Sequence, residues 1–261
     1  EGSDNTIIDA NGVGNAMLVT ANGVTLKNLT IRNWGDNLTE TEAGIKAKQT
    51  TNIILLNNRL TGNGFGIYLE GVENATIAGN KVQGNAQMRS ADRGNGIHLT
   101  SVNYVTVEDN DISYARDGLY IINSQENTLR NNRMSELRFG IHYMYSYNNE
   151  ITQNYAHNVK VGYALMSSNE LLVHNNKADG CEDYGLLLNF VNRSVISENH
   201  IVNVRSSMQP AVSGDEGKAL FVYNSTGNEI RGNQFVHSDM GIHLTAGSEQ
   251  NRVFENQFIE N

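Results

Sequence analysis

The feature that most constrains this chain is a segment that recurs with a period of about 22 residues. Each copy opens with a small residue and continues with an apolar residue, any residue and a second apolar residue. The opening residues are Gly44, Gly66, Gly96, Gly118, Gly140, Gly162, Gly185, Ala219 and Gly241. A fixed period of this length without helical periodicity is typical of a solenoid, in which each coil packs only on its neighbours.

The apolar residues of each copy predict short strands. They alternate directly after the opening residue, as in Ile97 and Leu99. A further apolar position recurs in the middle of each copy, as at Val107, and another recurs a few residues later, as at Ile112. Alternation places one face of a strand in a core. We therefore predict three short strands per coil and an all-β fold, a parallel β-helix (solenoid) of about ten coils of about 22 residues.

A column of asparagines accompanies the repeat. An Asn stands at the same offset from the opening residue in eight copies and one position later in the ninth: Asn58, Asn80, Asn110, Asn132, Asn154, Asn176, Asn199, Asn233 and Asn256. Because stacked strands lie about 4.8 Å apart, identical Asn side chains can bond amide to amide along the axis. We interpret these asparagines and the opening glycines as structural corner residues.

Residues 1–261 are expected to form a single β-helix domain, because each coil needs the next one to bury its apolar edge. Insertions interrupt the period at 84–93 and 205–215, and residues 34–41 form a third excursion. Such loops project from a rod and are places for specific contacts. No polar cap is recognisable at either end of the sequence. We therefore expect the chain to be a fragment of a longer protein, with cover of its ends by another protein as the alternative.

Charge and hydropathy disfavour several functions. The net charge is −9, which does not suit a nucleic-acid partner. No apolar run reaches the roughly 20 residues that a spanning helix needs, so we expect no direct membrane span. The single cysteine, Cys181, cannot form an internal disulfide.

Function is expected from the side chains that point outward on the first strand of each coil. The outward columns are rich in aromatic, imidazole and thioether groups and contain one acid, Glu70. An exposed stripe of this kind is typical of a contact surface, and cover by a loop is the alternative. We assign partner binding to Tyr68, His98, Tyr120, Phe221 and His243.

Many β-helix proteins act on acidic polysaccharides, which requires two or three carboxylates on one face. The acids of this chain are scattered, Asp117 among them, and no acidic pair recurs one coil apart. We therefore expect that the protein is not an enzyme. A carbohydrate-binding or carbohydrate-active protein (lyase, epimerase or hydrolase) is the alternative, with sugar rings stacked on Tyr68, Tyr120 and Phe221.

Thioethers and an imidazole lie close together in the predicted coils. Met144 and Met166 occupy the same outward position in adjacent coils, and His142 lies two residues before Met144 on the same face. Such donors favour monovalent copper. Met88 and Met208, in the two insertions, are secondary metal candidates. The alternative is that these methionines are adaptable apolar groups on a contact surface.

Six non-repetitive strings stand within the repeats: RGNGIHL (93–99), RDGLYI (116–121), LRFGIHYMYS (137–146), GYALM (162–166), GKALFVYN (217–224) and GIHLTAGSEQN (241–251). In this order they resemble the NosD family of periplasmic nitrous-oxide reductase maturation proteins, over about residues 66–261. The resemblance implies a right-handed parallel β-helix that is periplasmic and has no catalytic turnover of its own.

The resemblance also implies partners. Family members associate with an ABC transporter of a membrane permease and a cytoplasmic ATPase, which serves assembly of the copper centres of nitrous-oxide reductase in denitrification. A copper-chaperone lipoprotein is expected to dock on the β-helix and hand over Cu(I), bound transiently. The resemblance names no ligand, and we hypothesise that His142, Met144 and Met166 receive the copper or contact the chaperone.

Overall fold

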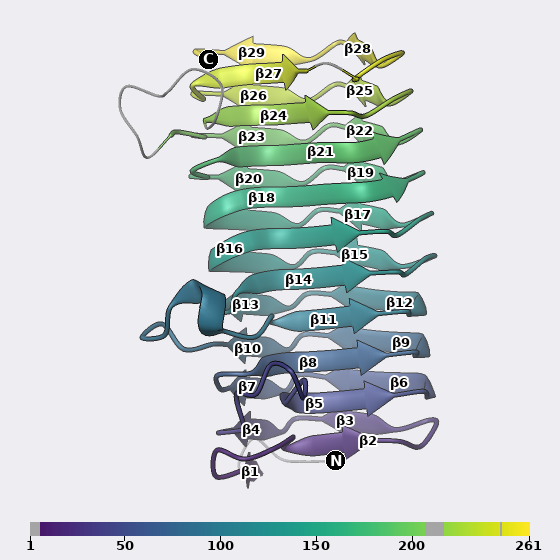
Figure 1. The fold of residues 1–261 in the computed structure, drawn as a ribbon, viewed down its shortest axis with the longest axis vertical. Coiled ribbons are helices and arrows are strands. Elements are labelled where there is room, and N and C mark those ends of the chain that lie inside the picture. The colour runs from purple at the N-terminus through teal and green to yellow at the C-terminus, as the bar shows by residue number, and fades with distance from the viewer. Residues whose placement is uncertain (1–5, 207–216, 246) are drawn as a thin grey trace.

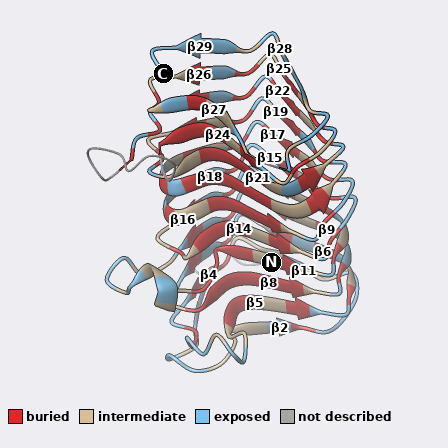
Figure 2. Cartoon of the chain, turned by 45° about the horizontal axis from the view of Figure 1, so that its top comes forward, coloured by how far each residue is buried: buried red, intermediate tan, exposed pale blue. Residues whose placement is uncertain are grey.

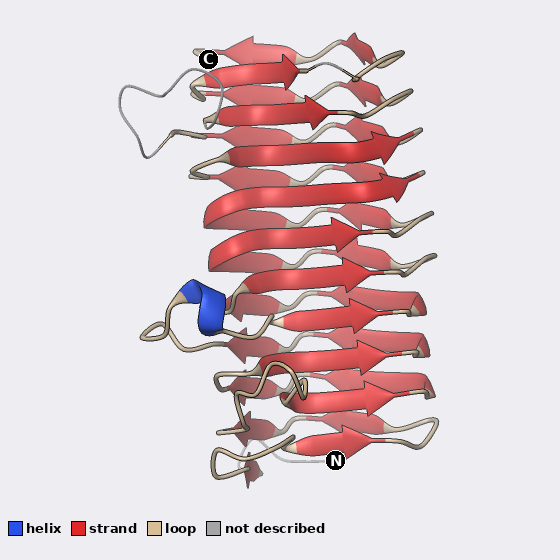
Figure 3. Ribbon diagram, in the orientation of Figure 1, coloured by secondary structure: helices blue, strands red, loops and turns tan. Residues whose placement is uncertain are grey.

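The computed structural model describes residues 6–206, 217–245 and 247–261. Its coils stack into one column, with the first and last coils at opposite ends (Figure 1). Figure 3 shows that the column is built of strands. The only helical segment in the described ranges is η1 (Ser90–Asp92), a 3-10 turn in the loop ahead of β11. No helix of this part of the chain is long and apolar enough to cross a membrane.

Three columns of parallel strands form the walls of the coil. The column that faces the viewer in Figure 1, here called the front face, consists of β2 (Met17–Val19), β5 (Ala43–Lys48), β8 (Phe65–Glu70), β11 (Ile97–Thr100), β14 (Asp117–Ile122), the second halves of β16 (Arg133–Met144) and β18 (Tyr155–Asn169), β21 (Tyr184–Asn192), β24 (Lys218–Tyr223) and β27 (Met240–Leu244).

The second column follows the front face along the chain and makes the ten-stranded sheet. Its strands are β3 (Thr25–Lys27), β6 (Thr51–Leu56), β9 (Glu73–Ala78), β12 (Asn103–Glu108), β15 (Thr128–Arg130), β17 (Glu150–Thr152), β19 (Leu172–His174), β22 (Val195–Ser197), β25 (Glu229–Arg231) and β28 (Arg252–Phe254).

The third column leads back to the front face of the next coil. It contains β1 (Ile7–Asp9), β4 (Thr30–Arg32), β7 (Arg59–Thr61), β10 (Lys81–Gln83), β13 (Asp111–Ser113), the first halves of β16 and β18, β20 (Lys177–Asp179), β23 (His200–Val202), β26 (Gln234–Val236) and β29 (Gln257–Ile259). In β16 and β18 the chain passes into the front face without leaving strand conformation, so that corner is a smooth bend.

The core lies where the repeat predicts it. Parallel pairing sets Ile97 opposite Leu119 and Leu99 opposite Ile121, and these four side chains are at most 1% exposed. The later apolar positions of the inner coils are buried as well, as in Leu129. Burial of one face of every strand on a shared core supplies the main stabilisation of a solenoid. The predicted parallel β-helix is confirmed.

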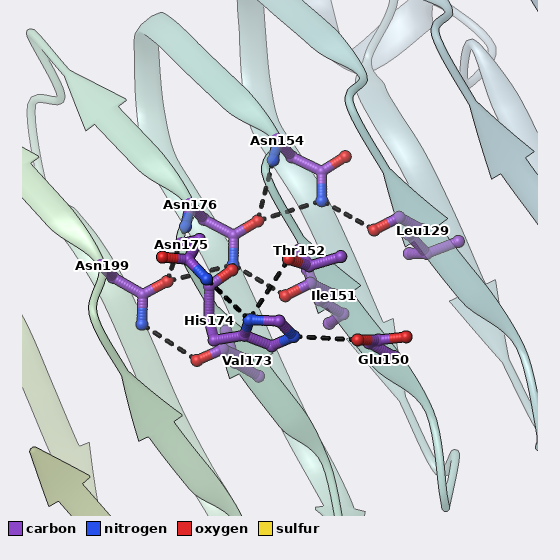
Figure 4. A network of polar contacts seen from close by, with 10 residues as sticks. All are labelled: Leu129, Glu150, Ile151, Thr152, Asn154, Val173, His174, Asn175, Asn176 and Asn199. Atoms are coloured by element: carbon purple, nitrogen blue, oxygen red, sulfur yellow. Dashed lines mark hydrogen bonds and ion pairs between the residues drawn. The ribbon is translucent and has the colours of Figure 1, made fainter.

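The asparagine column forms a continuous hydrogen-bonded ladder, as predicted. Asn154 donates through Nδ2 to Oδ1 of Asn176 at 3.0 Å, and Asn176 donates in the same way to Asn199 at 3.0 Å (Figure 4). Each rung also satisfies a backbone carbonyl, such as that of Leu129, which accepts from Asn154 at 2.9 Å. The ladder runs from Asn58 through to Asn256. The role of the ladder is therefore structural, because the amide groups of its asparagines form their hydrogen bonds to one another and to the backbone at this corner.

A second polar ladder escaped the sequence analysis. It lies at the corner between the front face and the second column, where the backbone N–H of Ser124 donates to Oγ of Ser146 at 3.0 Å. The N–H of Ser146 donates to Oγ of Ser168 at 3.1 Å. Ser124, Ser146 and Ser168 stand 22 residues apart in the sequence, and this spacing could have predicted the ladder. The stronger repeat of the neighbouring apolar residues drew attention away from it.

The opening glycines are not corner residues, and this prediction was wrong. Gly118 lies inside β14 and Gly140 inside β16, and neither has a positive φ. A Cβ at Gly118 would stand 2.5 Å from the carbonyl oxygen of Gly140 and 3.0 Å from Met134. Glycine is therefore required for close packing between coils. The left-handed residues of the Asn corner are those just before the ladder, such as Asn131 with a φ of 55°.

Candidate functional site

Aromatic and imidazole rings of successive coils stack along the front face. Parallel pairing sets His98 between Tyr68 on β8 and Tyr120 on β14, and Tyr120 opposite His142 on β16. The ring centroids of these neighbours lie 4.6, 4.6 and 4.7 Å apart. This spacing follows directly from the separation of paired strands, about 4.8 Å. The sequence-predicted alignment of these four residues is therefore present in the structure, and we call it the ring stack.

The ring stack is largely covered, whereas the sequence analysis expected it to be exposed. Tyr68 and His142 are each 8% exposed. Leu38, in the excursion between β4 and β5, packs against Phe65 and Tyr68. Figure 2 shows the central strands of the front face mainly in the buried colour. The expectation failed because sequence periodicity reports which way a side chain points, and not whether a loop lies over it.

A buried carboxylate stands at the end of the ring stack. Oδ2 of Asp117 lies 3.0 Å from Nδ1 of His142 and 2.6 Å from Nη2 of Arg138. Nε of Arg138 donates to Oδ1 of Asp117 at 2.8 Å. The Asp117 side chain is 1% exposed. The sequence predicts one acid in the outward columns, Glu70, and places Asp117 among the scattered acids. Asp117, at the start of β14, instead turns toward His142 of the ring stack.

Electrostatics keep Asp117 ionised. Burial acts to raise the pKa of Asp117, but the hydrogen bonds from His142 and Arg138 outweigh it and hold the pKa below its usual value. An ionised carboxylate only accepts hydrogen bonds, so the proton between the two groups belongs to Nδ1 of His142. In the neutral imidazole, Nε2 then carries the free lone pair. A carboxylate that fixes a histidine tautomer in this way is the usual second partner of a metal-binding histidine.

His98 has a different environment from His142. Burial lowers the pKa of His98 to about 4, and its Nδ1 lies 3.1 Å from Nδ2 of Asn95. The Asn95 amide donates there, so His98 is a neutral ring between two tyrosines at neutral pH. Its role in the site is to extend the ring stack rather than to carry charge.

The thioether of Met144 adjoins the ring stack. The hydroxyl of Tyr120 lies 3.5 Å from Sδ of Met144. Met144 is paired in register with Met166 on β18, but Met166 packs against the apolar cluster of Val161, Ala164 and Leu187. The front face therefore offers a thioether and an imidazole as neighbours. Over the described residues, no group of three or more His, Cys, Asp or Glu side chains is arranged to hold a metal ion.

The remaining predicted residues lie elsewhere. Phe221 and His243 are paired on β24 and β27, with ring centroids 5.2 Å apart, and form a cluster separated from the ring stack by β18 and β21. Met88 is half-buried in the loop between β10 and β11. Met208 lies outside the described residues. Burial raises the pKa of the Cys181 thiol to about 12, so the metal-free protein carries it as a buried, protonated thiol at neutral pH.

A pocket of about 370 Å³ opens over the ring stack, between the excursion at 34–41 and the loop at 84–93. We call it the loop pocket. It combines aromatic, imidazole and guanidinium groups with one carboxylate: Leu38, Phe65, Arg93, Asn95, His98, Arg116, Asp117, Tyr120, Arg138 and His142. The sequence analysis missed its arginines, although Arg116 and Arg138 occupy the same position in successive repeats.

The fold and the site define a parallel β-helix protein. Its front face carries a histidine oriented by a carboxylate, His142, and a thioether two residues further along the same strand, Met144. The chain belongs to the NosD family. The family model described as "Periplasmic copper-binding protein (NosD)" matches residues 78–261, and a model of a right-handed β-helix region matches residues 3–101. These matches confirm the family resemblance and the handedness expected from the sequence.

Two relatives are named "Probable ABC transporter binding protein NosD". The protein from Pseudomonas aeruginosa is 48% identical over 257 residues, which cover 97% of this chain and 60% of the relative. The protein from Stutzerimonas stutzeri is 47% identical over 261 residues, covering 98% of this chain and 59% of the relative. The chain thus spans about three fifths of the length of these relatives.

Several solved structures share the fold. The chain is similar to DFA-IIIase from Arthrobacter chlorophenolicus without its lid, with a TM-score of 0.68 and 15% identity over 94% of this chain and 70% of that one. It is also similar to a lacto-N-biosidase from Eubacterium ramulus, with a TM-score of 0.67 and 13% identity over 99% of this chain and 56% of that one. At these identities the likeness concerns the fold alone.

Proposed function

We propose that this chain is the β-helix part of a periplasmic accessory protein of an ABC transporter. In this proposal it serves assembly of the copper sites of nitrous-oxide reductase and has no catalytic turnover of its own. It docks a copper-chaperone lipoprotein, receives Cu(I) as transient cargo, and associates with the transporter permease and ATPase. The family description as periplasmic and copper-binding and the names of the relatives support this role.

The observation that carries the proposal is the pairing of His142 with Asp117. Because Nδ1 of His142 is held by Asp117 at 3.0 Å, Nε2 is the nitrogen available to a metal. Met144, two residues further along β16, supplies a soft thioether on the same face. Imidazole and thioether together select Cu(I) over harder cations. His142 and Met144 supply two donors and leave the remaining coordination positions open. An incomplete set of protein ligands suits a site that binds a copper ion transiently and then releases it.

Met166 is the third donor that we propose, because its backbone is in register with Met144. Its side chain packs on an apolar cluster and would have to turn toward Met144 to share an ion. Methionine has three rotatable side-chain bonds, so such a rearrangement needs no movement of the strand. Met88 remains a secondary proposal, at the entrance formed by the loop between β10 and β11. The proposed docking residues are His98, Tyr120, Phe221 and His243, which are half-buried, together with Tyr68, which is stacked against His98.

The carbohydrate alternative receives less support from the site. Of the three aromatic rings expected to stack on sugars, Tyr68 is only 8% exposed, and Phe221 lies apart from Tyr120, beyond β18 and β21, so the three rings offer no continuous exposed platform. Paired acids for glycoside chemistry would have to share one face. Asp117 is occupied by Arg138 and His142. Glu70, the acid of the outward columns, is paired with Lys48.

The test uses the full-length protein in a denitrifying strain that lacks the gene. We expect the wild type to co-purify with the transporter and to restore copper loading of nitrous-oxide reductase. The His142→Ala/Met144→Ala variant should co-purify but load less copper. Met240→Ala, an exposed thioether on β27, is the matched control and should behave as wild type. Failure of the wild type to associate with the transporter, or full loading by the double variant, would contradict the proposal.

A further inference from the structure

Three arginines stand in successive coils beside the ring stack. The N–H of Arg116 donates to the carbonyl of Gly94 at 2.9 Å, directly after Arg93, and the N–H of Arg138 donates to the carbonyl of Arg116 at 2.8 Å. All three side chains line the loop pocket. A column of guanidinium groups is unusual on a chain whose net charge is −9, and repulsion between like charges makes it costly unless an anion is present.

Among the described residues, one of these guanidinium groups has a carboxylate partner. Arg138 makes two hydrogen bonds to Asp117 and so pairs with the single carboxylate of the loop pocket. Arg93 bonds to backbone carbonyls, with Nη2 3.2 Å from the oxygen of Ala86. Across the described ranges, Arg93 and Arg116 form no ion pair. The pocket therefore carries two positive charges that no described carboxylate balances.

Arg116 also has an unsatisfied donor. Its Nε is buried, and in the part of the chain that is described it has no hydrogen-bond partner. A buried donor left unpaired is costly, so a group that accepts from it is strongly favoured. Oxyanions accept two parallel bonds from guanidinium and are the usual partners of arginine in pockets.

We propose that the loop pocket binds a small molecule through an oxyanion, a carboxylate or a phosphate, held by Arg116 and Arg93. Its volume of about 370 Å³ lies within the range of small-molecule sites. The rings of Phe65 and Tyr120 line the same pocket and provide an apolar wall for the body of the ligand. This role goes beyond the proposed copper transfer and does not depend on it.

A neighbouring pocket is a poorer anion site. It has a volume of about 460 Å³ and shares the three arginines, but it also contains Glu136, Glu182 and Lys160. Lys160 lies 3.7 Å from Glu182 and pairs with it, whereas Glu136 forms no ion pair in the described part of the chain and would repel an anion. In the loop pocket, by contrast, Asp117 is already paired with Arg138. The anion site therefore lies on the side of the arginines that faces the ring stack.

The test is calorimetric titration of the full-length protein with three sugars that differ only at carbon 6: galacturonate, galactose 6-phosphate and galactose. We expect galacturonate, galactose 6-phosphate or both to bind, with an affinity that falls as salt rises. Their ratio identifies the preferred oxyanion. Galactose should bind at least about tenfold more weakly, because it cannot accept charged hydrogen bonds.

Arg116→Gln should lower the affinity for the charged sugars about tenfold or more. Arg116→Lys should restore part of it by retaining the charge. Arg59→Gln, at an exposed arginine of β7, is the matched control and should bind as wild type. Urea denaturation of each variant verifies that it is folded. The proposal is overturned if galactose binds as well as the charged sugars, if neither charged sugar binds, or if folded Arg116→Gln retains full affinity.

Discussion

Oδ2 of Asp117 lies 3.0 Å from Nδ1 of His142, across two adjacent coils of the β-helix. Both side chains are nearly inaccessible to solvent. Arg138 completes the arrangement with two bonds to the same carboxylate. This relationship links stability to function, because the carboxylate that Arg138 neutralises also orients the imidazole of His142.

Asp117→Asn is expected to destabilise the protein by about 2–4 kcal/mol, because it removes the negative charge that neutralises Arg138 in a largely buried pair. Asp111→Asn is the control, since Asp111 is half exposed and 4.0 Å from Lys81, and it should cost less than about 1 kcal/mol. Urea denaturation measures both. An equal loss of unfolding free energy in the two variants would contradict this expectation, because it would mean that the Asp117 ion pair contributes no more than an exposed one.

The Asp117 contribution should also depend on pH. The folded state holds the pKa of Asp117 below its usual value of 3.8. Its stabilisation is therefore fully present above that value and is lost as the pH falls through the lower folded pKa. The difference in unfolding free energy between wild type and Asp117→Asn should shrink below pH 3.8. A difference that stays constant down to strongly acidic pH would contradict the lowered pKa.

His98 predicts a separate pH effect. Burial lowers its pKa from 6.5 to about 4, so the unfolded chain takes up a proton at a pH where the folded chain does not. Stability should therefore fall as the pH drops from 6.5 to 4, by up to about 3 kcal/mol for this one group. His98→Gln should flatten the dependence, and the exposed His200→Gln should not. Identical slopes in both variants would refute the assignment.

The asparagine ladder should be sensitive at its interior rungs. Asn154 accepts from the N–H and Nδ2 of Asn132 at 3.0 and 2.9 Å, and it donates to Asn176 and to Leu129. Asn154→Ala leaves these buried groups unpaired and should cost about 2–4 kcal/mol in urea denaturation. Gln234→Ala, at an exposed position of β26, should cost less than about 0.5 kcal/mol. A similar small loss at Asn154 would mean that water replaces the rung.

The sequence predicted the fold well because every coil repeats the same burial pattern. The alternation around Ile97 and Leu99 and the column of asparagines each require stacked coils, and both are present. The opening glycines were misassigned, because sequence alone does not distinguish a left-handed corner from a strand that lacks room for a Cβ. Gly118 is of the second kind.

The site was predicted only in part. The alignment of Tyr68, His98, Tyr120 and His142 follows from the period, since equal positions in successive coils must stack. The burial of Tyr68, by contrast, depends on Leu38, in a loop without a repeat. The role of Asp117 depends on a side chain that turns across to the next coil, which periodicity does not encode.

Anaerobic competition titration of Cu(I) against a chromophoric chelator is the most direct test of the proposal that His142 and Met144 on the front face bind copper. With the full-length protein, His142→Ala and Met144→Ala should each weaken Cu(I) binding about tenfold or more, because each removes one of the donors that select the ion. Met240→Ala should bind as the wild type does. Wild-type affinity in folded His142→Ala and Met144→Ala would contradict the account and place the copper elsewhere.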